Sequence, residues 1–516
     1  MKKLFALVLA LCLMLSMVSL STAEGPEVYR FDKPLTLKIS VFDRGAPGGT
    51  DVTNNFYSKW IQENFGDPRN IKIEWVVIPR SEEEAKLATL ITSADTCPDI
   101  CFTYNTAIVS NYAGLGGLTE LSSYIDQYGP TLKEFLGSAI LDAGRYNGGQ
   151  YAIPARRVVV AWMGSFIRED WLEKLGLPMP TTKEEFLNCL RAFRDKNPGN
   201  VAGGCIPFAM SADMRYIPWY ISFIKNFDPK MFATVPQVKW DGYKDFVQFL
   251  NTMYNEGLLS PDFQSDTTRE LENNAITSGQ AGGYHNNYDH PIRVSPGLLA
   301  GLRAYEPDAK LSVLNCFESV IDGKYYHLVY NADGLQIFVP SYSDEDHVKA
   351  AVMYLDWLSQ YDTIYFLQNG IEGETYDLNE DGIPIVKDVT GDKHFNSMQN
   401  IDYTLTINGQ WLDTEERTIA AQALSYQGFA DLYEPMYVAG NENPVQTIYH
   451  FEDIIESDAQ YNTSLANLQK ELLVRCTRCK PEEFSALYDQ LVDDYMAQGG
   501  QAVMEERIAS WDKAHQ

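Results

Sequence analysis

The sequence predicts an α/β fold, because strand patterns alternate with amphipathic helix patterns along the chain. Residues 35–42 (LTLKISVF) are rich in β-branched side chains and alternate in polarity, and residues 71–78 form a second strand-like run. Ser81 can cap a helix over residues 82–92, and a short strand is expected at residues 99–103. Strands separated by helices of about ten residues or more are typical of βαβ units, so we expect a parallel sheet.

The middle of the chain has the same alternation. Thr182 and Glu185 have the spacing of a capping box at a helix start. Residues 241–256 predict an amphipathic helix, and residues 334–340 (GLQIFVP) predict another buried strand. The other expected elements are helices over about residues 54–64 and 347–360 and a mostly helical, polar region after about residue 400.

The N-terminal segment, residues 1–23, has the pattern of a secretory signal peptide. Lys2 and Lys3 precede a mostly apolar run, and small residues at Ser21 and Ala23 fit the −3 and −1 sites of cleavage. We therefore expect a secreted, cell-surface or periplasmic protein, peripheral to the outer face of the cytoplasmic membrane.

Attachment to the membrane is a separate question, raised by Cys12. A lipidation signal places its cysteine after a small residue, whereas Leu11 precedes Cys12 and the cysteine lies in the middle of the apolar run. Ordinary cleavage after Ala23 is the favoured interpretation. An atypical lipidation site and an uncleaved anchor remain the alternatives.

The overall charge excludes one class of partner. The chain has 41 basic and 70 acidic residues and a net charge of −29. Such a field repels phosphate backbones, so we expect no nucleic-acid binding.

The cysteine pattern and the lack of catalytic motifs give little support for an enzymatic activity. Seven cysteines follow the signal, an odd number that leaves at least one thiol without an intramolecular disulfide partner, and buried free thiols are favoured. The sequence lacks G-x-S-x-G, H-E-x-x-H and G-x-x-x-x-G-K-[ST] motifs. A glycosidase needs only two carboxylates, so a secreted carbohydrate-active enzyme stays an alternative.

One segment has the spacing of a calcium loop. The oxygen ligands of this possible site would come from Asp377, Asn379, Asp381, Ile383 and Asp388. Pro384 and the strand-like residues after it favour a β-hairpin, with Asp381 and Gly382 at its tip. The hairpin is the favoured interpretation, and calcium is the only cofactor considered.

Several segments resemble the extracellular solute-binding proteins of ABC importers, of the large sugar-binding type found in Gram-positive bacteria. Residues 90–100 are similar to the family pattern L-x-A-S-G-D-x-P-D-I, with Ala94 in place of the usual glycine. The other similar segments are residues 151–154, 167–176, 180–186, 276–282, 356–358 and 370–376. The resemblance covers about residues 35 to 390 and does not identify the sugar.

This resemblance implies a two-lobe periplasmic-binding-protein-like fold with a ligand cleft and a hinge that the chain crosses more than once. Lobe 1 would comprise residues 24–155 and about 315–395, and lobe 2 about 156–314 and 396–516. The implied protein is a monomer that binds a carbohydrate, expected to be an oligosaccharide, by hinge closure without catalysis, and its partners are ABC permease subunits. A sugar-sensing receptor subunit is a further alternative.

Sugar recognition uses flat aromatic faces and planar polar groups, which we expect in loops after the carboxyl ends of strands. The candidate ligand-binding residues are Asp43, Arg44, Tyr104, Asn105, Arg156, Trp162, Tyr216, Trp219, Tyr284 and Asn286. Among them Tyr104, Trp219 and Tyr284 are the strongest candidates. The adjacent Arg156 and Arg157 fit either an acidic sugar, such as a uronide, or salt bridges at the hinge.

Overall fold

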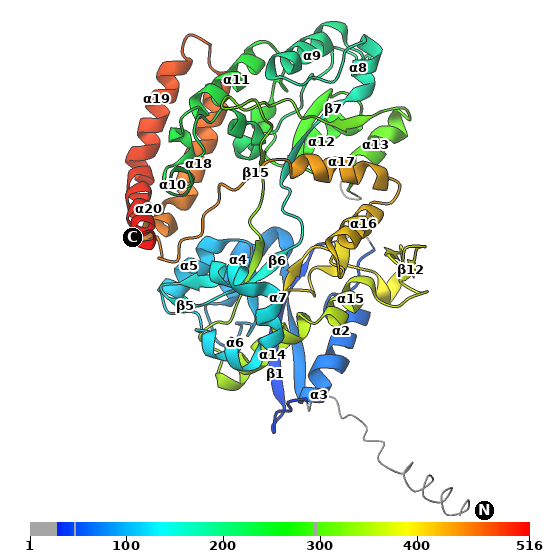
Figure 1. Ribbon diagram of the computed structural model, residues 1–516, viewed down its shortest axis with the longest axis vertical. Helices are drawn as coiled ribbons and strands as arrows, with labels where there is room; N and C mark the ends of the chain where they lie inside the picture. The colour runs from blue at the N-terminus through cyan, green and yellow to red at the C-terminus, as the bar shows by residue number, and fades with distance from the viewer. Residues whose placement is uncertain (1–27, 46–47, 294–296) are drawn as a thin grey trace, which may run out of the picture.

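The protein has two lobes, seen one above the other in Figure 1. The computed structural model describes residues 28–45, 48–293 and 297–516, so the predicted signal segment lies outside the described residues. Lobe 1 has a hydrophobic core drawn from residues 31–155 and 335–407. Lobe 2 has cores drawn from residues 161–328 and 426–491. Each lobe combines helices and strands, which confirms the α/β fold class.

The sheet of lobe 1 is mixed rather than parallel. β1 (Leu35–Asp43) pairs in parallel with β2 (Ile71–Pro79), and Ile39 forms a parallel bridge to Ile100 beside β3 (Cys101–Thr103). β11 (Asp333–Phe338) runs antiparallel to β3 and to β6 (Ile153–Arg157), and β14 (Ile407–Asn408) is parallel to β6. The direction of β11 is reversed because this strand brings the chain back from lobe 2.

Helices cover the sheet of lobe 1. α14 (Glu345–Leu358) packs against α6 (Ser122–Tyr128), α7 (Pro130–Leu141) and β1, and its N-cap Asp344 accepts a hydrogen bond from the His347 N–H. The helices of this lobe are α2 (Phe56–Ile61), α3 (Asp67–Arg69), α4 (Glu83–Leu90), α5 (Thr106–Gly114), α6 (Ser122–Tyr128), α7 (Pro130–Leu141), α14 (Glu345–Leu358) and α15 (Tyr361–Asn369). Short hairpins are formed by β4 (Arg145–Tyr146) with β5 (Gly149–Gln150) and by β12 (Tyr376–Leu378) with β13 (Pro384–Val386).

Lobe 2 contains an antiparallel sheet in the order β8 (Gly283–Asn287), β7 (Met163–Arg168), β9 (Leu311–Val313). Thr182 caps α9 (Lys183–Lys196) as expected, but the Glu185 carboxylate accepts hydrogen bonds from Thr181 instead of Thr182. The helices are α8 (Glu169–Leu175), α9 (Lys183–Lys196), α10 (Pro229–Thr234), α11 (Tyr243–Asn255), α12 (Glu270–Thr277), α13 (Leu298–Tyr305), α17 (Ala430–Gly440), α18 (Glu456–Arg478), α19 (Phe484–Tyr495) and α20 (Gln501–Ala514). β10 (His327–Leu328) pairs with β15 (Pro444–Val445).

The chain crosses between the lobes several times (Figure 1). Residues 158–162 lead from β6 to β7, and residues 329–332 return to β11. These two crossings lie side by side, because the Tyr330 N–H donates to the Val160 carbonyl over 2.8 Å. A third crossing follows α16 (Glu415–Ser425).

The core contacts locate the return crossings on the chain. Cys316 and Leu328 pack in lobe 2, whereas Leu405 and Ile407 pack in lobe 1. The crossing from lobe 2 to lobe 1 therefore lies after residue 328, downstream of the expected position near residue 315. The later crossing back to lobe 2 lies after residue 407, downstream of the expected position near residue 396. The division of the chain into two domains stays a prediction. Among the described residues, no helix is both long and apolar enough to cross a membrane.

Candidate ligand-binding site between the lobes

One edge of the lobe 1 sheet faces the crossings. β1, β3 and β6 end at this edge and β11 begins there, as their pairing registers require. Arg44 follows β1, Tyr104 follows β3 and Arg157 is the last residue of β6. Asn408 lies beside Arg157 in the neighbouring strand β14. Three separate strand ends thus carry polar and aromatic side chains to the lobe junction.

Arg44 and Tyr104 belong to one contact network. The Arg44 guanidinium forms a bidentate ion pair with Asp402, and the Tyr104 hydroxyl accepts a hydrogen bond from the Asn408 side-chain amide over 3.0 Å. The Arg80 guanidinium lies 5.0 Å from the centre of the Tyr104 ring. Burial disfavours the charge of Arg44, but the hydrogen bond and the charge of Asp402 outweigh burial and raise the Arg44 pKa.

Aromatic rings from three segments meet at the crossings. The Trp162 ring centre lies 4.9 Å from that of Tyr330 and 6.1 Å from that of Tyr216. We call Trp162, Tyr216 and Tyr330 the aromatic platform. Tyr216 is 42% exposed, and Trp162 and Tyr330 are partly buried. Such partly exposed aromatic faces can pack against the C–H surfaces of a sugar ring.

Charged side chains flank the platform. The Arg157 guanidinium lies 4.2 Å from the centre of the Tyr330 ring, and that of Arg215 lies 5.4 Å from the centre of the Tyr216 ring. Arg215 forms a bidentate pair with Asp213, whose carboxylate also lies 3.6 Å from Lys470. The hydrogen bond and the charge of Asp213 raise the Arg215 pKa against the effect of burial. The site is therefore a strip of aromatic and cationic groups.

Two of the strongest candidates lie in the lobe 2 core. Trp219 is 1% exposed, donates its indole N–H to the Ser165 hydroxyl over 2.8 Å and stacks on Phe317. Tyr284 is fully buried and packs against Phe166. Trp219 lies on a 3₁₀ turn that folds inward, and Tyr284 points to the inner side of β8. Neither ring face is open at the lobe junction in this structure.

The remaining candidates, Asn105, Asn286, Asp43 and Arg156, make local contacts instead of joining the cluster at the junction. The Asn105 side chain caps α5 and donates to Glu84, and the buried Asn286 accepts from the Asn287 N–H. Asp43 is exposed and accepts from the Gly45 N–H. The Arg156 guanidinium lies 4.7 Å from the centre of the Phe135 ring, toward α7. The junction thus collects Arg44, Tyr104, Trp162 and Tyr216 from the predicted set, and their role in ligand binding stays a prediction.

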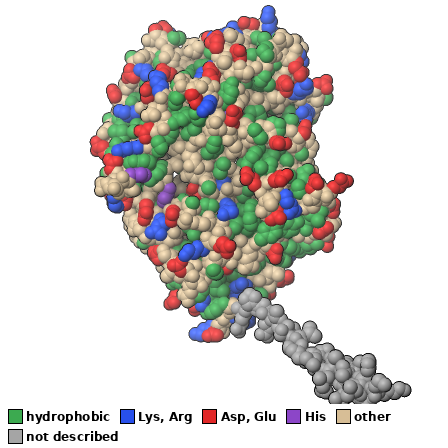
Figure 2. All heavy atoms as spheres, viewed as in Figure 1, with side chains coloured by type: hydrophobic (Ala, Val, Ile, Leu, Met, Phe, Trp, Pro, Cys, Tyr) green, Lys and Arg blue, Asp and Glu red, His purple; other side chains and the backbone are tan. Residues whose placement is uncertain are grey.

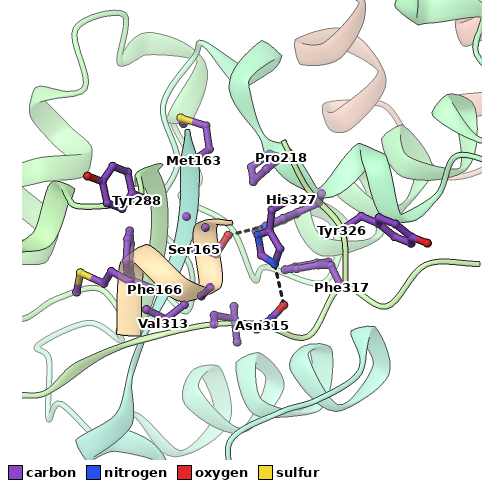
Figure 3. A pocket seen from close by; sticks show the side chains of 16 residues that line it. Met163, Ser165, Phe166, Pro218, Tyr288, Val313, Asn315, Phe317, Tyr326 and His327 are labelled. Carbon is purple, nitrogen blue, oxygen red and sulfur yellow. Dashed lines mark hydrogen bonds between the residues drawn. The ribbon is translucent and has the colours of Figure 1, made fainter. Parts of the chain in front are cut away.

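A small cavity of about 30 Å³ lies inside lobe 2 (Figure 3). Its lining includes Ser165, Trp219 and His327, and the His327 ring nitrogen lies 3.3 Å from the Asn315 side-chain oxygen. Burial lowers the His327 pKa to about 4. This volume is enough for about one water molecule, so the cavity cannot hold a sugar.

The segment with calcium-loop spacing is a β-hairpin, as the favoured interpretation expected. Tyr376 pairs with Val386 in the β12–β13 register. The Asp377 carboxylate lies 2.7 Å from the Lys387 ammonium, and the Asn379 side-chain oxygen accepts from the Asp381 and Ile383 N–H groups. Among the described residues, no three His, Cys, Asp or Glu side chains are grouped to hold a metal ion. The Asp377 carboxylate and the Asn379 side-chain oxygen thus take part in local contacts, and calcium binding by this hairpin stays a prediction.

Sequence reasoning missed Tyr330, Asn408, Arg80 and Asp402. Tyr330 follows β10 in a segment without a motif, and Asn408 and Asp402 lie in the region predicted only as helical and polar. Their position at the junction depends on strand pairing over long separations, for which the local sequence contains no signal.

Comparison with known proteins agrees with this architecture. Residues 51–291 match the family model described as bacterial extracellular solute-binding protein. The chain is 27% identical over 329 residues to lipoprotein LipO of Bacillus subtilis, which covers 61% of this chain and only 63% of LipO. It is 21% identical over 460 residues to the polygalacturonan/rhamnogalacturonan-binding protein YtcQ of the same species, with 86% of each chain covered.

Solved structures share the fold. The FusA substrate-binding protein of S. pneumoniae in complex with kestose superposes with a TM-score of 0.67 at 16% identity, covering 93% of this chain and 99% of FusA. The alginate-binding protein AlgQ2, in a crystal structure without calcium ion, gives a TM-score of 0.66 at 20% identity over 95% of this chain and 100% of AlgQ2. The chain therefore resembles the bacterial extracellular solute-binding proteins over residues 51–291, in agreement with the resemblance drawn from its motifs.

Proposed function

We propose that this protein is the substrate-binding component of a carbohydrate ABC importer and that it binds an oligosaccharide between its lobes. The observation that carries this proposal is the aromatic platform, in which Trp162 and Tyr330 from the two adjacent crossings meet Tyr216 of lobe 2. The proteins named above that bind polygalacturonan, alginate and kestose support a carbohydrate ligand.

Binding would proceed by hinge closure. Residues 158–162 and 329–332 connect the lobes beside the platform, so a rotation about these segments would bring Arg44 and Tyr104 of lobe 1 toward Tyr216 of lobe 2. A sugar held on both sides would stabilise the closed form, which the permease subunits would recognise. In this proposal the protein binds and releases its ligand unchanged and acts as a monomer at the outer face of the membrane.

The experiment is a screen of the protein without residues 1–23 against oligosaccharides by thermal shift, followed by calorimetry and small-angle scattering. We expect a Kd in the micromolar range or below for at least one oligosaccharide and a smaller radius of gyration with ligand. Absence of binding to all carbohydrates would contradict the proposal. Chromatographic detection of a cleaved product would favour the secreted carbohydrate-active enzyme instead.

A further inference from the structure

Among the described residues, no carboxylate forms an ion pair with Arg157 at the lobe junction. Its Nε donates to the Asp333 carbonyl oxygen over 3.4 Å, and its guanidinium lies over the Tyr330 ring. Within the described residues, neither Nη atom has a hydrogen-bond partner and no carboxylate lies within 4.0 Å of the group. The side chain is partly buried, so its charge is only partly solvated.

Two other arginines, Arg44 and Arg293, are neutralised by acidic side chains. Arg44 pairs with Asp402 at 2.8 Å, and Arg293 pairs with Asp289 at 2.6 Å. In a chain with 70 acidic and 41 basic residues, acidic side chains are abundant as partners. Among the described residues, Arg157 therefore differs from these two paired arginines at the point where the proposed ligand would bind.

Stacking orients the free donors. The Tyr330 ring covers one face of the Arg157 guanidinium, and the same ring contacts Trp162 in the aromatic platform. A guanidinium held by its face presents its Nη edge to a planar group, and a carboxylate can accept two parallel hydrogen bonds from that edge. A sugar ring on the platform would place a substituent beside these donors.

Arg156, the preceding residue of β6, is a second cation without an ion pair among the residues that the structure describes. Its guanidinium lies over the Phe135 ring, and no carboxylate among the described residues lies within 4.0 Å of it. Burial lowers the Arg156 pKa. The sequence left two interpretations open for this pair of arginines, an acidic sugar and salt bridges at the hinge. Among the residues that the structure describes, neither arginine forms such a salt bridge.

We propose that the oligosaccharide ligand contains uronic acid residues, and that Arg157 binds a uronate carboxylate of the sugar that packs on the aromatic platform. This inference rests on the proposed function and adds the class of sugar. It chooses the acidic-sugar interpretation of the Arg156–Arg157 pair and assigns to Arg157 the discrimination between acidic and neutral oligosaccharides.

The test is calorimetry with short oligomers of galacturonate, glucuronate and mannuronate and with the methyl ester of each, which removes the charge but keeps the sugar. We expect at least one acidic oligomer to bind about 10- to 100-fold more tightly than its ester, because a hydrogen-bonded charge pair contributes that much. Arg157→Gln should remove most of this difference, whereas Arg157→Lys should keep part of it. Arg475→Gln, on the exposed surface of α18, is the matched control and should bind as the parent does.

The outcomes separate the two proposals. If neutral oligosaccharides or esters bind as tightly as the acids, the uronate inference is overturned and the proposed function stands. If Arg157→Gln weakens acid and ester equally, Arg157 has only a structural role and the inference is also overturned. Absence of binding to every oligosaccharide would overturn the proposed function itself.

Discussion

Arg44 and Asp402 form a bidentate ion pair that joins two distant parts of the chain in lobe 1. The Arg44 Nε lies 2.9 and 3.0 Å from the two carboxylate oxygens, and Nη2 lies 2.8 Å from one of them. The side chain of Asp402 is 2% exposed and that of Arg44 is 27% exposed. The pair ties the loop after β1 to the segment before β14, next to Tyr104 and Asn408.

Asp402→Asn should lower the free energy of unfolding by about 2–4 kcal/mol, because it leaves a largely buried guanidinium without its charge partner. Urea denaturation measures this change. The double variant with Arg44→Gln should be less destabilised than the sum of the two single variants, since the second change removes the unpaired charge. Strict additivity of the two changes would show that the pair contributes no coupling energy.

This pair shows what the sequence could predict and what it could not. Arg44 was predicted because it directly follows an alternating strand, a local pattern that needs no partner. Asp402 lies 358 positions away in a region with no strand signal, so only the folded chain places it there. Contacts between residues far apart in the sequence account for most of the site residues that the sequence did not predict.

Trp219 and Tyr284 show a second limit. Both follow turn or strand signals, and both side chains lie in the lobe 2 core. The sequence alone does not tell whether an aromatic residue near a strand end lies in the core or on a binding surface, because both environments favour aromatic residues. The side that the ring faces depends on tertiary packing. The helix and strand predictions were better determined, since periodicity and caps such as Thr182 are local.

Trp162→Ala should raise the Kd for the best oligosaccharide about 10- to 100-fold, because it removes the ring that joins Tyr216 and Tyr330. Calorimetry measures the affinity, and circular dichroism checks that the variant is folded. Tyr305→Ala is the control, since Tyr305 is 76% exposed on α13. Unchanged affinity in Trp162→Ala would place the ligand away from the platform. Figure 2 shows one face of the two lobes, on which hydrophobic, acidic and basic side chains are interspersed.

Calcium should have little effect on stability. The Asp377 carboxylate is paired with Lys387, and the Asn379 side-chain oxygen accepts from two backbone N–H groups, so a cation would have to compete with these contacts. We expect the Tm measured in excess EGTA and in millimolar CaCl₂ to agree within about 1 °C. A calcium-dependent rise of several degrees that Asp381→Ala abolishes would contradict this hairpin arrangement.

Glu272 in α12 gives the protein a pH-dependent stability. It is 1% exposed, one carboxylate oxygen lies 3.2 Å from an Arg269 nitrogen, and the other has no hydrogen-bond partner. Burial raises the Glu272 pKa to about 7, although the charge of Arg269 opposes the shift. Between the ordinary value of 4.5 and about pH 7, the folded state therefore binds more protons at this site than the unfolded chain.

The free energy of unfolding contributed by this group is present below about pH 4.5 and is lost as the pH rises through about 7. Glu272→Gln does not titrate, so between pH 5 and pH 7.5 the variant should lose less stability than the parent, by on the order of 2 kcal/mol. Burial lowers the pKa of His290 to about 3, which adds a slope of opposite sign, but that slope is common to both proteins and cancels in the comparison. Urea denaturation at each pH measures the difference, and Glu270→Gln, an exposed change on the same helix, should follow the parent. Parallel pH profiles for the parent and Glu272→Gln would show that Glu272 is already ionised in the folded protein at pH 5.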